Sequence, residues 1–240
     1  ISDRSMRETV HDYLLNIGFR KDIFVRGARR LSPLRQSQYL SEFGLVLLVP
    51  RMECKLTFKL NVGEMQGKPQ TYEPLLDALA RGPQSFMQLN ELFGGGARIN
   101  AALVESASLL IATQQAAVYS LAAPQVSAST ALLVNQQLLQ RVQFGDDYTV
   151  LASHLAGSGI TTTFVERLLL LVWQQQPHAS LQELAEQGYA IMQTLGRTMV
   201  KDDKRLESAQ DNIGALAEQF DYLLRTKMPI WQQHGCAVAQ

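Results

Sequence analysis

Apolar side chains recur at helix or strand spacing along most of the chain, and Gly, Pro and Ser residues separate the runs. Spacings of three and four predict helices, and strict alternation predicts half-buried strands. Over residues 1–70 the expected elements are a helix around Val10–Ile17, a strand at 19–25, a helix from Ser32 to about Phe43, a buried strand at 45–49 and a strand at 56–62.

The pattern changes over residues 71–124. We expect helices over Tyr72–Ala80, from Ser85 onward and from Ile99 to about Thr113, and then a strand at 117–121. Three helices followed by a strand is the order typical of a winged-helix unit. From residue 125 onward the pattern is mostly helical, apart from a strand or loop at 149–155.

These elements predict an α+β fold that is predominantly helical. We expect a small, basic α/β N-terminal unit over residues 1–70, a winged-helix-like middle unit over 71–124 and a helical C-terminal unit over 125–240. Apolar residues make up 46% of the chain, an ordinary value for a globular protein with a full core.

Several classes of protein are disfavoured by composition. The longest apolar run, Leu168–Trp173, is six residues long, far below the ~18 that a membrane-spanning helix needs, so we expect no membrane span. No secretory leader is recognisable, and Ile1 leads us to expect a fragment or a processed product. Cys54 and Cys236 are too few for a disulfide framework or a cysteine-rich zinc site. We therefore expect two reduced thiols in a cytoplasmic protein.

The formal charge is zero, with 22 basic and 22 acidic side chains, but residues 1–60 carry 11 basic and 6 acidic groups. Six of these cations lie within sixteen residues, and Asp22 is the acidic residue among them. They are Arg20, Lys21, Arg26, Arg29, Arg30 and Arg35. We name residues 20–35 the basic stretch and consider its cations candidates for docking an acidic partner or a neighbouring domain. The alternative is a solvated strand edge whose charges prevent aggregation.

The sequence contains no strong catalytic, cofactor-binding or metal-binding motif. The glycines at 94–96 follow a predicted helix, whereas a dinucleotide or S-adenosylmethionine loop follows a buried strand. The four histidines lack metal-site spacing, and the acidic pairs at 146–147 and 202–203 fit a turn and a solvated charge run. We predict no catalytic, cofactor-binding or metal-binding residue. Because residues 69–140 contain only Arg81 and Arg98 as cations, we expect no nucleic-acid partner.

Residues 13–26 (YLLNIGFRKDIFVR) resemble the opening of the predicted methyltransferase regulatory domain, which follows the catalytic core in some bacterial class I S-adenosylmethionine-dependent methyltransferases. Phe19-Arg20 and Arg26 match the family's aromatic–arginine pair and the basic end of its strand. The unit at 72–121 looks like the family's middle part, and residues 149–160 (TVLASHLAGSGI) are similar to a later stretch. Relatives include bacterial enzymes that methylate lysines of outer-membrane proteins.

The resemblance implies a non-catalytic accessory region that packs on the catalytic methyltransferase domain of the same protein and helps recognise a protein substrate. S-adenosylmethionine would be bound in that catalytic domain, and this chain would bind no cofactor itself. Two alternatives stay open. One is a stand-alone winged-helix module for interaction or transcription, and the other is an enzyme whose site is assembled from scattered residues, such as His154 with Asp146 or Asp147.

Overall fold

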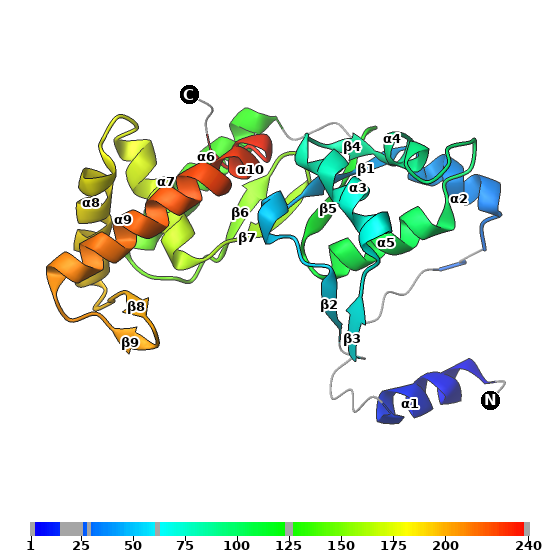
Figure 1. Ribbon diagram of the computed structural model, residues 1–240, viewed down its shortest axis with the longest axis horizontal. Coiled ribbons are helices and arrows are strands. Elements are labelled where there is room, and N and C mark those ends of the chain that lie inside the picture. Colours follow the sequence, from blue (N-terminus) through cyan, green and yellow to red (C-terminus); the bar gives the residue numbers. More distant parts are fainter. Residues whose placement is uncertain (1–2, 15–25, 28–29, 61–62, 123–126, 238–240) are drawn as a thin grey trace.

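The computed structural model describes residues 3–14, 26–27, 30–60, 63–122 and 127–237 (Figure 1). Its helices are α1 (Arg4–Leu14), α2 (Pro33–Leu40), α3 (Pro69–Ala80), α4 (Phe86–Glu91), α5 (Ala101–Ala112), α6 (Ala128–Gln140), α7 (Phe164–Gln175), α8 (Leu181–Thr194), α9 (Ala209–Thr226) and α10 (Met228–Gln233), with short 3-10 turns η1 (Arg51–Glu53) and η2 (Arg141–Gln143). Its strands are β1 (Phe43–Leu47), β2 (Thr57–Leu60), β3 (Gly63–Gln66), β4 (Gln84–Ser85), β5 (Ala116–Ser120), β6 (Val150–Ser153), β7 (Ser158–Thr161), β8 (Val200–Lys201) and β9 (Lys204–Arg205).

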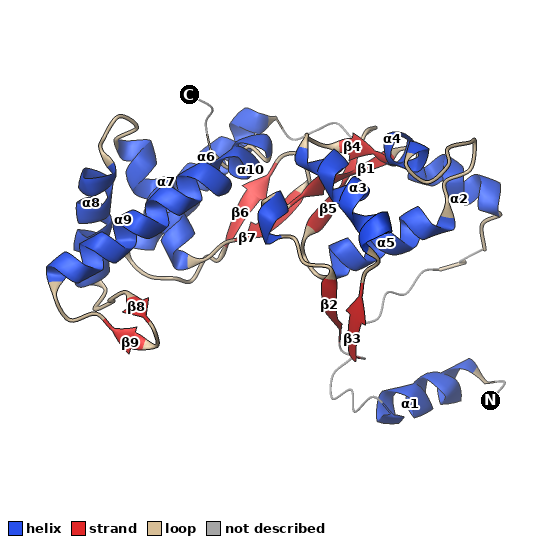
Figure 2. Cartoon of the chain, viewed as in Figure 1, coloured by secondary structure: helices blue, strands red, loops and turns tan. Residues whose placement is uncertain are grey.

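The fold class is α+β and predominantly helical, as the sequence predicted (Figure 2). Every strand pairing within the described residues is antiparallel. In the same part of the chain, no helix combines the length and the apolar character needed to cross a bilayer.

Helix starts follow the side chains that the sequence offers for capping. Ser32, Ser85 and Thr163 each accept a hydrogen bond from a backbone N–H of the first turn, at the starts of α2, α4 and α7. At α4 and α7 a Gln or Glu three residues on completes a capping box. The predicted starts of these helices are therefore confirmed, because a hydroxyl before a helical run satisfies amides that otherwise lack a partner.

The three-stranded sheet has the order β4-β1-β5, with β1 in the middle. Leu45, Val46 and Leu47 are fully buried there, which confirms a buried strand in this region. Gly44 allows the close approach of the neighbouring strands, because a Cβ at this position would lie 2.5 Å from the Gln84 carbonyl oxygen and from the Tyr119 ring.

Two hydrophobic clusters form the core. The N-terminal cluster contains Leu45, Leu47, Phe58, Tyr72, Leu75, Leu76, Ala78, Leu79, Phe86, Leu89, Ile99, Leu103, Ala107, Leu110 and Ala116. It spans the predicted unit boundary at residue 70, because β1 supplies the middle strand between β4 and β5. The division into three units stays a prediction.

The C-terminal cluster is built around α7, whose apolar run Leu168–Trp173 is buried throughout. Helices α8 and α9 pack beside it, and α6 and the β6–β7 hairpin, which contribute Leu139, Leu151 and Ile160 to the cluster, lie on its side toward the three-stranded sheet (Figure 1). Helix α1 stands apart from the body in the same view.

Several local predictions differ from the structure. The first helix begins at Arg4, earlier than expected, and the predicted strand at 19–25 lies outside the described residues. The structure adds β3 after the predicted strand at 56–62. The solvated charge run is the turn of the β8–β9 hairpin, with φ of 50° at Asp202 and 59° at Asp203. Sequence patterning missed these strands because two- and four-residue exposed strands have no hydrophobic period to reveal them.

Candidate functional site

A buried polar junction joins the two hydrophobic clusters, and His234 is its centre. The fully buried imidazole lies with Nε2 2.9 Å from the Leu47 carbonyl oxygen of β1 and Nδ1 2.8 Å from Ser153 Oγ of β6. Because a carbonyl oxygen only accepts, Nε2 carries the proton, and Nδ1 accepts from the Ser153 hydroxyl. Burial lowers the pKa of His234, which favours this neutral imidazole.

His154 and Gly235 complete the junction. His154 Nδ1 donates to the His234 carbonyl oxygen at 2.9 Å. Gly235 has φ of +71°, and a Cβ there would lie 2.3 Å from His154 Nδ1. The fully buried Asn135 exchanges hydrogen bonds of 2.7 and 2.9 Å with the backbone of Ala152. Side chains and backbone from α6, β6 and the end of the chain therefore meet with little free space.

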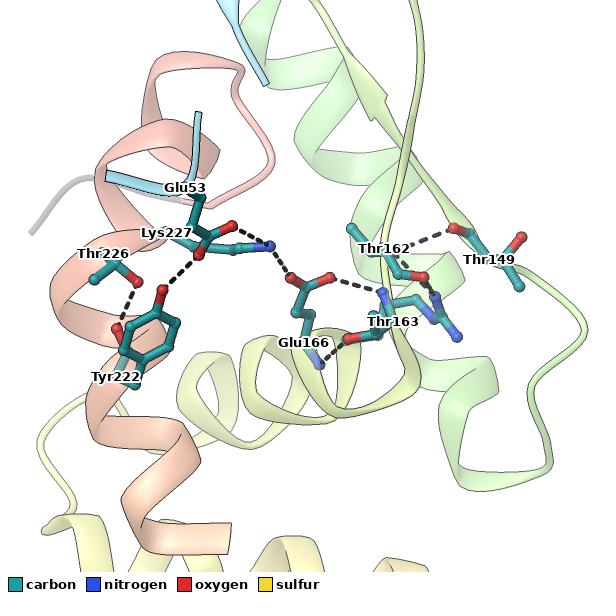
Figure 3. A network of polar contacts seen from close by, with 9 residues as sticks. Glu53, Thr149, Thr162, Thr163, Glu166, Tyr222, Thr226 and Lys227 are labelled. Atoms are coloured by element: carbon teal, nitrogen blue, oxygen red, sulfur yellow. Dashed lines mark hydrogen bonds and ion pairs between the residues drawn. The ribbon is translucent and has the colours of Figure 1, made fainter. Parts of the chain in front are cut away.

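A second polar network links η1 with α7 and the end of α9 (Figure 3). Lys227 Nζ lies 2.6 Å from Glu166 Oε1 of α7 and 3.6 Å from Glu53 Oε2 of η1. Tyr222 of α9 donates its hydroxyl to Glu53 Oε1 at 2.7 Å. Burial alone would lower the pKa of Lys227, but Glu166 and Glu53 outweigh burial and raise it. The network therefore holds a charged ammonium between two carboxylates.

Glu166 also caps the start of α7. One of its carboxylate oxygens accepts from the Thr163 backbone N–H at 2.7 Å, and the other contacts Lys227 (Figure 3). The cap of α7 and the tie to Glu53 thus share one side chain.

A cluster of two arginines and one aspartate lies at the first turn of α7. Arg167 is 1% exposed and donates to the Thr162 carbonyl oxygen and to Asp146. Arg197 Nη1 lies 3.2 Å from the second oxygen of Asp146, and its guanidinium stacks 4.2 Å from the centroid of the Phe164 ring. Asp146 is therefore the counter-ion of two guanidiniums, and Arg167 Nε has no partner among the described residues.

The docking candidates are placed only in part. Arg20, Lys21 and Arg29 lie outside the described residues. Arg26, Arg30 and Arg35 are exposed, and no ion pair within the described ranges includes them. Leu31 and Leu34 beside them are also exposed. The part of the basic stretch that is described thus presents cations and apolar side chains together on the surface.

The remaining candidates are the two cysteines and the possible metal ligands. Cys54 and Cys236 are both free thiols, and burial raises their pKa to about 11 and about 12. The thiolate is the reactive form, so both groups are held in the unreactive one. Within the described ranges no three His, Cys, Asp or Glu side chains form a group that could hold a metal ion.

Sequence reasoning missed the Ser153–His234 contact, which joins residues 81 positions apart. Ser153 and His154 are adjacent in sequence, and each of their side chains bonds to residue 234. Sequence spacing carries no signal for a contact of this kind, because β6 and the segment after α10 meet only when the C-terminal cluster folds.

Comparison with known proteins gives one point of reference. The chain is 28% identical over 238 residues to an uncharacterized protein of the cyanobacterium Synechocystis, a match that covers 98% of this chain and 46% of the relative. The chain thus spans less than half the length of that relative. No protein-family model matches the chain, and no solved structure does.

Proposed function

We propose that this chain is a non-catalytic accessory region of a class I S-adenosylmethionine-dependent methyltransferase. In this proposal it packs on the catalytic domain and contributes to recognition of a protein substrate. The methyl-donor site lies in sequence outside these 240 residues, and the protein works in the cytoplasm.

The observation that carries the proposal is a contrast between the interior and the surface. The polar groups of the junction bond mainly to one another, whereas Arg26, Arg30 and Arg35 are exposed and in no ion pair within the described ranges. Exposed cations beside exposed Leu31 and Leu34 suit a docking surface for an acidic partner. The resemblance of residues 13–26 to the methyltransferase regulatory domain favours a catalytic methyltransferase domain as that partner. The relative is more than twice as long as this chain, so the rest of its sequence is long enough to contain such a domain.

Binding to the catalytic domain tests the proposal. We would titrate the chain calorimetrically with S-adenosylmethionine and then with the separately produced catalytic domain of the same polypeptide. We expect no heat from the cofactor and clear binding of the domain, weakened by salt because the cations are exposed. Micromolar binding of the cofactor to this chain, or no binding of the domain, would overturn the proposal.

A charge-reversal variant locates the contact. The triple variant Arg26→Glu, Arg30→Glu, Arg35→Glu should weaken binding of the catalytic domain by about tenfold or more. The control is Arg81→Glu, because Arg81 is exposed at the end of α3, outside the basic stretch. Equal weakening by both variants would mean a general charge effect and would remove the basic stretch from the contact.

The second candidate is a stand-alone winged-helix module. The order α3-β4-α4-α5-β5 around one small sheet favours it. Against it stands the charge of α5, which contains Glu105 and no Lys or Arg. A helix that reads DNA needs cations for the phosphates. A salt-sensitive gel shift with mixed-sequence duplex DNA would favour this candidate, and no shift at low salt would exclude it.

A further inference from the structure

A hollow of about 470 Å³ opens beside the arginine–aspartate cluster, between the start of α7 and the β8–β9 hairpin. Its apolar floor is made by Phe164, Met192 and Met199, which are buried. Arg197 and Arg205 line it too, and no acidic side chain does so among the described residues.

The two arginines differ in what they already bind. Arg197 gives one nitrogen to Asp146 and lies over Phe164, so its position is fixed from two sides. The Arg205 side chain makes no hydrogen bond or ion pair with any part of the chain that the structure describes. Asp146 also pairs with Arg167, so the carboxylate that Arg197 contacts is shared by two guanidiniums. Both charged side chains that line the hollow are therefore cations, and that of Arg205 has no counter-ion within the described ranges.

The hairpin explains why Arg205 lies at the hollow. Arg205 is the cross-strand partner of Val200, and both residues line the hollow. Lys204 pairs with Lys201 on the opposite face, where Lys201 Nζ lies 3.3 Å from Glu218 Oε2 of α9. Successive side chains of a strand alternate between faces, so the hairpin directs one of its cations to the hollow and another to solvent.

We propose that this hollow is a binding site for a carboxylate attached to an apolar group. The guanidinium of Arg205, together with the free nitrogens of Arg197, binds the carboxylate, since an arginine fork matches its two oxygens. The apolar group lies on the floor of Met192, Met199 and Phe164, where thioethers and a ring adapt to different shapes. A bare phosphate would leave that floor uncovered. The proposal does not depend on the accessory function proposed above.

Methionine methyl groups report on binding directly. We would record methyl spectra of the whole chain labelled at methionine and add N-acetylphenylalanine, its neutral amide, or inorganic phosphate. We expect the acid to shift the Met192 and Met199 signals and leave that of Met52, which is exposed on η1. The amide and phosphate should bind about tenfold more weakly or not at all.

Two substitutions in one hairpin provide the matched test. Arg205→Gln should weaken binding of the acid by about tenfold, and Lys204→Gln should leave it nearly unchanged, although both remove one exposed positive charge. Both sites are exposed, and the spectra themselves show that each variant folds. Equal shifts by acid and amide, no shift at millimolar acid, or equal effects of the two substitutions would each overturn the proposal.

A further comparison separates two sources of the ligand. A short peptide that ends in phenylalanine with a free carboxylate should bind more tightly than N-acetylphenylalanine if the natural ligand is a protein or peptide terminus. Equal affinity would assign the hollow to a small organic acid, and the carboxylate site itself would hold in both cases.

Discussion

At the scale of single residues, the junction depends on side chains that have no substitute of equal shape. His234 both donates and accepts in a site without water access, and Gly235 leaves space that the His154 ring fills. A buried polar group that loses its partner costs about 1–3 kcal/mol, so these positions should be sensitive to small changes.

The titration of His234 should make stability depend on pH. Burial lowers its pKa in the folded state below the ordinary value of 6.5, so the unfolded chain binds the proton more readily. The stabilisation is therefore complete above pH 6.5 and is lost as the pH falls below that value, by at most about 1.4 kcal/mol per pH unit. Urea unfolding between pH 5 and 7.5 measures this slope. His234→Gln should reduce it, whereas His178→Gln, at an exposed site, should leave it unchanged.

Gly235→Ala should destabilise the protein more than Gly157→Ala. Both glycines have φ near +65°, with +71° at Gly235 and +61° at Gly157, so both variants suffer the backbone cost of about 1–2 kcal/mol. A Cβ at Gly157 meets nothing within 4 Å, while one at Gly235 collides with His154. The difference between the losses of unfolding free energy in the two variants measures the cost of that collision. Equal values would show that the ring of His154 moves aside without cost.

At the scale of elements, one lysine ties α7, η1 and the end of α9 together. Lys227 is 21% exposed and Glu166 only 7%, so this pair is shielded from solvent. The pair of Lys201 and Glu218 has the same chemistry but is 57% and 73% exposed. Burial, and not the mere presence of an ion pair, should decide how much each pair contributes to the free energy of unfolding.

Lys227→Ala should therefore lower the free energy of unfolding by about 1–3 kcal/mol, because the Glu166 carboxylate stays buried without its partner. Lys201→Ala serves as the control and should cost about 0–1 kcal/mol, because both of its charges remain in water. Urea unfolding at neutral pH measures both values. A cost for Lys227→Ala no larger than that for Lys201→Ala would contradict this account.

At the scale of the whole molecule, two hydrophobic clusters are joined by polar contacts and by two apolar side chains, since Leu48 packs against the C-terminal cluster and Ile230 against the N-terminal one. Trp173 and Trp231, the two tryptophans of the chain, both belong to the C-terminal cluster. Tryptophan fluorescence therefore follows the unfolding of that cluster, whereas circular dichroism follows the helices of both.

Removing one polar tie should separate the two unfolding transitions. In the double variant Glu53→Ala, Tyr222→Phe the fluorescence and dichroism curves should no longer coincide, because the contacts of Glu53 with Tyr222 and Lys227 are lost. The control Arg51→Ala breaks the 2.7 Å ion pair with Asp77 between η1 and α3, which leaves both ties in place. Coincident curves in the double variant would show that the contacts of His234, Leu48 and Ile230 keep the clusters cooperative without this network.

The sequence by itself determined the fold class, the buried α7 and the starts of α2, α4 and α7. These features depend on local chemistry, namely apolar periodicity and a hydroxyl beside unpaired amides. Only the tertiary structure decided that β1 lies between β4 and β5, that Ser153 meets His234 and that Arg197 and Arg205 line one hollow. The first two contacts join segments distant in sequence, and the third depends on the β8–β9 hairpin, which has no hydrophobic period, so local patterning reveals none of them.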